Sequence, residues 1–202
     1  MLNVIKNLFA SKTVLKKGTQ RKLELLGLEE RVVPATFTVV NNFDSGAGSL
    51  RQAIIDANAT AANDTIDFSV VNSPYTINLA SALPNIATTS SAGTLTINGL
   101  GASSLTIDGN QGNFSIFSVA SGGNLTISGV TVSGANINGN GGAFNNAGTL
   151  TVSNSTISGN TVVVFGGGIF NNGALNIANS TLSGNRANFG GGIFNNSNST
   201  ST

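Results

Sequence analysis

The acidic side chains are the residues of this sequence best suited to chemistry, because the chain contains no His and no Cys. General acid–base reactions need paired carboxylates, and hard cations need several carboxylate ligands. Asp64 and Asp67 form the one close pair after residue 35, and no acidic residue follows Asp108. We therefore expect no enzyme activity and no catalytic, cofactor-binding or metal-binding site. The complete acidic set is Glu24, Glu29, Glu30, Asp44, Asp56, Asp64, Asp67 and Asp108.

These carboxylates have simpler expected roles. Asp64 and Asp67 lie on one predicted strand, which leaves one of them at a corner and the other on the surface. Asp108 occupies the position that Ser133 and Ser158 hold in later repeats. Because Asp often bonds its own backbone two residues on, we expect Asp108 to stabilise a corner as an Asx-turn.

Glycine runs and basic residues give no ligand-binding motif. Gly166–Gly168 and Gly190–Gly192 lack the Lys-Ser/Thr pair and the helix that let a glycine-rich loop bind phosphate, so we expect turns. Beyond residue 33 only Arg51 and Arg186 are basic. A nucleic-acid-binding protein carries a basic surface on its folded part, so the sequence argues against this class.

Residues 1–35 differ from the rest and are predicted to form a partly disordered leader for export or sorting. Residues 1–33 carry seven basic and three acidic side chains, a net charge of +4. An amphipathic basic start is typical of an export or membrane-surface signal, although a solvated segment without a partner has the same composition. No apolar run approaches the ~20 residues of a helical transmembrane span.

From about residue 93 the sequence repeats every 25 residues. Each unit reads as three short strands joined by Gly- or Asn-rich corners, without a helical segment. A propeller blade needs ~40–50 residues and helical repeats need a helix, so both architectures are disfavoured. The period predicts coils of about 25 residues that stack over residues 93–202. The expected fold is all-β: a right-handed, single-stranded parallel β-helix with an N-terminal capping α-helix.

Stacked coils place residues 25 apart beside each other and therefore predict ladders. One column should be aliphatic and formed by Leu125, Leu150 and Leu175. A second should be an aromatic stack in the interior, formed by Phe144, Phe170 and Phe194. Their spacing is 26 and then 24 residues, and we place this one-residue slip in the turn between Asn160 and Gly166. A third should be an amide ladder, each member followed by a second Asn, formed by Asn145, Asn171 and Asn195. Like charges in a column repel each other, which accounts for a charged content of only 8%.

A row of threonines also follows the repeat, consisting of Thr106, Thr131, Thr156 and Thr181. Such a row of hydroxyls could bind glycans or ice. Threonine also favours strands, however, and this preference alone explains the pattern.

Residues 36–92 are predicted to hold the N-terminal cap and the first coils. Ser49 precedes Gln52 by three residues, the spacing of a capping box, and an apolar stripe follows it. We expect a helix over residues 49–59 that covers the end of the coils. At the other end the sequence stops just where another coil should begin, so we expect an array truncated at its C-terminus.

Three motifs resemble known bacterial sequences. Gly167–Asn172 and Gly191–Asn196 read GGIFNN and Gly141–Asn146 reads GGAFNN, which resembles the GGAI and FxxN tetrapeptides of polymorphic outer-membrane protein repeats. Asp44–Ile54, with its Ser-Leu-Arg, is similar to the start of large bacterial surface β-helix proteins, and Leu23–Ala35 is similar to a leader motif of exported proteins. The resemblance implies the cell envelope, at the outer membrane surface, or secretion, with adhesion or display as the usual role.

Several functions remain open from the residues. The leading hypothesis is a non-catalytic cell-surface or secreted β-helix module that serves as an adhesion or display scaffold. The alternative is a carbohydrate-binding or carbohydrate-active β-helix, of lyase or hydrolase type, without a recognisable catalytic site in this chain. A third is a fragment of a longer repeat protein. The expected partners are surface glycans or other envelope proteins, and no cofactor is expected.

Overall fold

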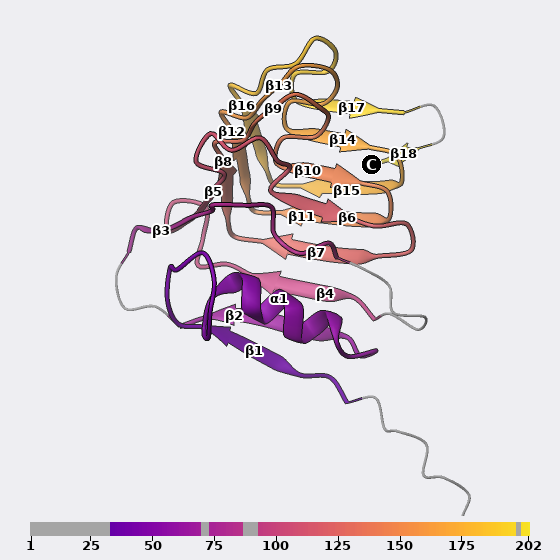
Figure 1. The fold of residues 1–202 in the computed structure, drawn as a ribbon. Helices are drawn as coiled ribbons and strands as arrows, with labels where there is room; N and C mark the ends of the chain where they lie inside the picture. Colours follow the sequence, from indigo (N-terminus) through magenta and orange to yellow (C-terminus); the bar gives the residue numbers. More distant parts are fainter. Residues whose placement is uncertain (1–32, 70–72, 87–92, 197–198) are drawn as a thin grey trace, which may run out of the picture. The chain divides into compact units, whose positions relative to one another are not determined.

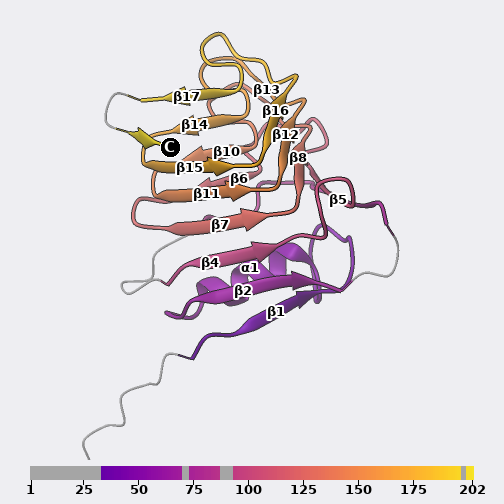
Figure 2. The same cartoon turned by 180° about the vertical axis from the view of Figure 1, so that it is seen from behind.

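The structure, a computed structural model, describes residues 33–69, 73–86, 93–196 and 199–202. These described residues belong to one compact unit. Nearly all of the predicted leader, residues 1–32, lies outside the described residues, so its expected role stays a prediction. Figure 1 and Figure 2 show short strands stacked one above another, with the single described helix, α1, beside β1 and β2.

The largest sheet has seven strands, and every pair in it is parallel. Each turn of the backbone contributes one strand to this sheet. Strands that are adjacent in the sheet are therefore one whole coil apart in the sequence. The side chains alternate between the interior and the outer face. In Asn124–Ser128, for example, every second residue is buried. In sheet order, the strands are β1 (Thr36–Val39), β2 (Asp64–Phe68), β4 (Leu95–Asn98), β7 (Asn124–Ser128), β11 (Thr149–Ser153), β15 (Ala174–Ala178) and β18 (Thr200–Ser201).

Three further parallel sheets complete the coils. The second sheet contains β3 (Tyr75–Asn78), β5 (Leu105–Asp108), β8 (Thr131–Ser133), β12 (Thr156–Ser158) and β16 (Thr181–Ser183). The third sheet contains β6 (Phe117–Val119), β10 (Phe144–Asn146), β14 (Ile169–Asn171) and β17 (Ile193–Asn195). A two-stranded sheet lies between them and contains β9 (Asn136–Ile137) and β13 (Thr161–Val162). The predicted all-β fold, a parallel β-helix, is confirmed.

The helix α1 (Leu50–Asn58) closes the hydrophobic interior beside β1 and β2. Its apolar stripe is buried in the same core cluster as the inward residues of the strands. Ser49 is the N-cap, and its hydroxyl oxygen accepts a hydrogen bond from the Gln52 N–H at 3.2 Å. The second half of the expected capping box is missing, because the Gln52 side chain donates to Asp56 instead. The predicted helix is therefore confirmed, with only one of the two capping bonds.

Candidate functional site

The predicted leucine column is present in the interior. Leu150 pairs in register with Leu125 on one side and with Leu175 on the other, and the three side chains are at most 3% exposed. Leu95 extends the column by one coil. Full burial of each leucine contributes about 1.5–3 kcal/mol, so the column stabilises the scaffold.

The predicted phenylalanine stack is wrong in its membership. Phe144 pairs with Phe117 and Ile169, not with Phe170. Phe117 and Phe144 stack inside the solenoid with ring centroids 5.2 Å apart, whereas Phe170 and Phe194 stack on the outer face at 5.9 Å. Because strand side chains alternate in direction, an alignment shifted by one residue exchanges the two faces.

The change of coil length lies later than the phenylalanine spacing indicates. The backbone keeps the 25-residue step from Phe144 to Ile169, and the next step, from Ile169 to Ile193, has 24. The turn that contains Phe165 is one residue longer than the turn after it, since Phe165 pairs with Phe189 while Thr161 pairs with Arg186. The predicted slip is thus confirmed within Asn160–Gly166. The extra residue is present relative to the following coil, whereas the preceding coil has the same length here.

The asparagine ladder exists, but its first member is Asn146 and not Asn145. Asn146 donates from Nδ2 to Oδ1 of Asn171 at 2.7 Å, and Asn171 donates likewise to Asn195 at 3.0 Å. Asn146 and Asn171 have no exposed surface. Asn145 pairs instead with Ser118 and Phe170 and is half-buried on the outer face. An amide can transmit such a chain because it both donates and accepts.

A second amide pair was not predicted. Asn160 is fully buried, and its Nδ2 donates to Oδ1 of Asn185 at 3.0 Å and to the Val132 carbonyl at 3.2 Å. Its own Oδ1 accepts from the Ala135 N–H at 3.1 Å. The spacing of 25 residues between the two asparagines was a usable signal in the sequence.

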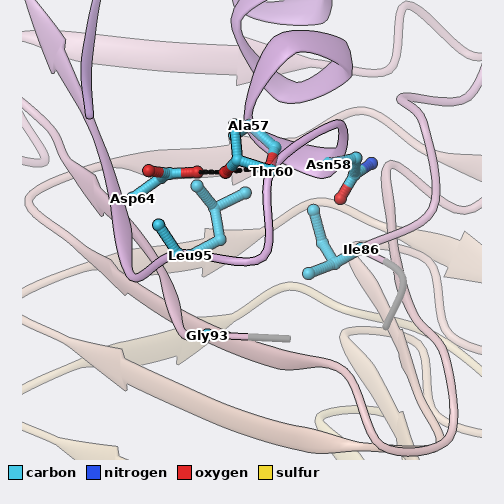
Figure 3. A pocket seen from close by; sticks show the side chains of 8 residues that line it. Ala57, Asn58, Thr60, Asp64, Ile86, Gly93 and Leu95 are labelled. Carbon is cyan, nitrogen blue, oxygen red and sulfur yellow. Dashed lines mark hydrogen bonds between the residues drawn. The ribbon is translucent and has the colours of Figure 1, made fainter. Parts of the chain in front are cut away.

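The Asp64–Asp67 pair does not converge on a reaction site. Asp64 is 2% exposed and accepts hydrogen bonds from the Ala35 N–H at 2.8 Å and from the Thr60 hydroxyl. Asp67 is on the other face of β2, where it accepts from the Asn98 amide at 2.9 Å. Asp64 and Thr60 line a pocket (Figure 3) whose volume of about 20 Å³ has room for little more than one water molecule.

Asp108 has the predicted turn role. Its Oδ1 accepts from the Asn110 N–H at 2.6 Å, the bond of an Asx-turn, and its Oδ2 accepts from the Ser133 hydroxyl of the next coil at 3.1 Å. In the part of the chain that the structure describes, no three His, Cys, Asp or Glu side chains come together as a metal site would require.

An ion pair at the N-terminal end was also missed by the sequence reasoning. Arg51 and Asp44 approach to 2.6 Å, and the same guanidinium donates to the Ser81 carbonyl at 2.8 Å and to the Ala82 carbonyl. Asp44 also accepts from the Ala80 N–H at 3.0 Å. We call these residues, Asp44, Arg51 and 80–82, the arginine clamp. It fastens α1 to the chain that follows β3.

The outer faces carry regular polar rows. The predicted threonine row lies in register on the second sheet and gains one member, so that it comprises Thr76, Thr106, Thr131, Thr156 and Thr181. A second row on the seven-stranded sheet comprises Thr36, Thr65, Thr96, Thr126 and Thr151. The Thr131 hydroxyl donates to the Ala102 carbonyl at 2.6 Å, so this side chain also serves a local structural role.

Four phenylalanines form an aromatic cluster on the outer surface, and we call this set the outer Phe cluster. Phe165 lies 4.4 Å from Phe194, 5.4 Å from Phe189 and 6.3 Å from Phe170 between ring centroids. Phe189 is 58% exposed. In the preceding coil the corresponding position of Phe170 is Asn145, so an uncharged amide borders the cluster.

Comparison with family models, with curated proteins and with solved structures finds no match for this chain. Among the described residues, no helix has the length and apolar character needed to cross a membrane.

Proposed function

We propose that this chain is a non-catalytic β-helix module of a bacterial cell-surface or secreted protein, in which the rigid coils serve as a scaffold for adhesion or display. The observation that carries the proposal is the use of the carboxylates. Each acidic side chain in the described residues accepts a hydrogen bond from its own fold, and the five are Asp44, Asp56, Asp64, Asp67 and Asp108.

The motif that resembles polymorphic outer-membrane protein repeats supports the proposed location. Gly141 opens one copy of the motif, and Gly166 and Gly190 directly precede the other two copies; the three stand at the same turn of successive coils with φ of +66°, +66° and +63°. A side chain at each of them would collide with the backbone three residues later. Glycine is therefore required at this turn, which lies at the start of the motif in each of the three coils.

Location is tested by expressing the full chain in a Gram-negative host and treating intact cells with protease. We expect the chain in the medium or on the cell surface, and we expect deletion of residues 1–35 to leave it in the cytoplasm. Retention of the full chain in the cytoplasm would contradict the proposed location. A second assay follows reducing ends and unsaturated uronates across a polysaccharide panel. Release of either product would contradict the non-catalytic role.

A second candidate function, carbohydrate binding, is favoured by the outer Phe cluster. Exposed phenyl groups can pack against the C–H faces of sugar rings, and uncharged amides such as that of Asn145 can bond sugar hydroxyls. Exposed apolar patches commonly mark binding surfaces. A glycan array with the full chain tests this function. Signals that are lost in Phe189→Ser and kept in Phe43→Ser, where the residue is 66% exposed but lies outside the cluster, would favour recognition.

A further inference from the structure

The Asn-Gly pairs of this chain are chemically alike but differ in their structural protection. The sequence contains four of them, Asn98–Gly99, Asn138–Gly139, Asn140–Gly141 and Asn172–Gly173. Asn-Gly is the dipeptide most prone to spontaneous deamidation, because glycine leaves the following nitrogen unhindered and the backbone free to rotate. The reaction requires the asparagine side chain and the next N–H to leave any hydrogen bonds that hold them.

In three of the pairs, both the glycine N–H and the asparagine side chain make hydrogen bonds. The Gly99 N–H donates to the Ser128 carbonyl at 2.7 Å, and the Asn98 amide donates to Asp67 at 2.9 Å. The Gly141 N–H donates to the Phe165 carbonyl at 3.0 Å, and Asn140 Oδ1 accepts from the Phe165 N–H at 3.2 Å.

The third protected pair lies beside the amide ladder. The Gly173 N–H donates to Oδ1 of Asn171 at 3.2 Å, and Asn172 Oδ1 accepts from Asn196 at 2.9 Å. In each of these three pairs, deamidation must first break the hydrogen bond of the attacking N–H and release the side chain.

Asn138–Gly139 is the exception. Among the described residues, neither the Gly139 N–H nor the Asn138 side chain has a hydrogen-bond partner. Asn138 is exposed, and an ideal Cβ on Gly139 would meet no atom within 4 Å. The pair lies in the loop between β9 and β10, only two residues before the protected Asn140.

We propose that Asn138 is a site of spontaneous modification, where the folded protein converts to aspartate and isoaspartate. The Gly139 nitrogen attacks the Asn138 side-chain carbonyl carbon, the new N–C bond replaces the C–Nδ2 bond, and ammonia leaves with the proton of that N–H. Water then opens the succinimide at either carbonyl. No group is oxidised or reduced.

The modification changes the charge of a region that has almost none. The sequence carries no acidic side chain after Asp108, so each event adds a negative charge to coils whose one charged side chain in the sequence is Arg186. The modified protein is therefore separable from the parent chain by ion exchange.

The test incubates the folded full chain in heavy-oxygen water at mildly alkaline pH and locates the incorporated label by tandem mass spectrometry. We expect Asn138 to react roughly tenfold or more faster than each of the other three, because these must first lose their hydrogen bonds. In denaturant the four rates should converge to within a few-fold. Asn140 is the internal control, since it shares the loop and the dipeptide.

The variant Gly139→Ala completes the test. Space around Gly139 is open and no left-handed φ is present there, so alanine should fit and should slow the reaction at Asn138 severalfold through steric hindrance. The proposal is overturned if Asn138 reacts no faster than the other three pairs in the folded chain, or if the alanine variant gains charge as quickly as the parent.

Discussion

At the scale of single residues, the buried amides depend on being neutral. Asn171 accepts from Asn146 at 2.7 Å and from the Gly173 N–H at 3.2 Å through one atom, Oδ1. Its Nδ2 donates to Asn195 and to the Gly173 and Thr200 carbonyls at 3.0–3.2 Å. A carboxylate could keep the first set of bonds but would turn the second into contacts between acceptors.

We therefore expect Asn171→Asp to destabilise the protein by about 3 kcal/mol, because it buries a charge that faces three oxygen atoms. Chemical denaturation measures the effect. The neighbouring Asn172→Asp is the matched control, since Asn172 is exposed and uses Oδ1 to accept from Asn196. Equal midpoints for the two variants would show that the ladder contributes no stability.

The single tyrosine gives a prediction about pH. The Tyr75 hydroxyl is buried without a hydrogen-bond partner among the described residues, and burial raises the pKa of this phenol above its usual value near 10. The folded state then holds the proton more tightly than the unfolded state. Its contribution to stability is complete below about pH 10 and is lost as the pH rises through the folded pKa.

We expect tyrosinate absorbance to titrate at higher pH in the folded chain than in denaturant, and Tyr75→Phe to weaken the loss of stability above about pH 10. The variant should also be neutral or slightly stabilising at neutral pH, because it removes an unsatisfied polar group. Identical titration curves for folded and denatured protein would contradict the burial of this phenol.

The sequence predicted the residue columns where identity repeats and missed them where identity changes. Leu125, Leu150 and Leu175 are the same residue type at a constant spacing, so the sequence predicts their pairing register correctly. The third sheet places Phe144 beside Ile169, and two adjacent asparagines allow either alignment of the motif. Only the pleat decides between them, because it sends Phe170 outward and Ile169 inward.

At the scale of elements, the arginine clamp is a polar contact that joins the capping helix to the coils, in addition to the buried apolar stripe of α1. Its partners come from separate parts of the chain, and the carbonyls of residues 81 and 82 leave no signature in side-chain identity. This is why the sequence indicated the helix from its stripe and its N-cap but not its attachment. The guanidinium suits the position, since it can donate to several oxygen atoms in fixed directions.

Arg51→Ala should lower the stability by about 2 kcal/mol, because it leaves Asp44 without its cation and removes donors from three backbone carbonyls, those of Asp44, Ser81 and Ala82. Arg51→Lys should restore only part of the lost stability, since an ammonium group cannot donate to several oxygen atoms in the fixed directions of a planar guanidinium. Arg186→Ala serves as the control, because that side chain is exposed. Thermal unfolding of the variants is the measurement, and a similar loss for both alanine variants would argue against the clamp.

At the scale of the whole molecule, the coils differ in how completely neighbours cover them. Val152, Ile157 and Ile169 have no exposed surface. The residues that pair with them in the next coil, Ile177, Leu182 and Ile193, are only partly buried. In a solenoid each coil is stabilised mainly by the coils on either side of it, so local stability should follow this coverage.

Hydrogen exchange should therefore be slowest in β7, β8, β11 and β12 and clearly faster in β15, β16 and β17, because a coil whose inward side chains are only partly buried opens at lower free energy. Leu150→Ala should speed exchange in the coils on both sides of it, since its side chain contacts two neighbours in the column. Leu175→Ala should affect mainly its own coil and the last strand. Uniform protection across all coils, or equal effects of the two substitutions, would mean that the array opens as one cooperative unit rather than coil by coil.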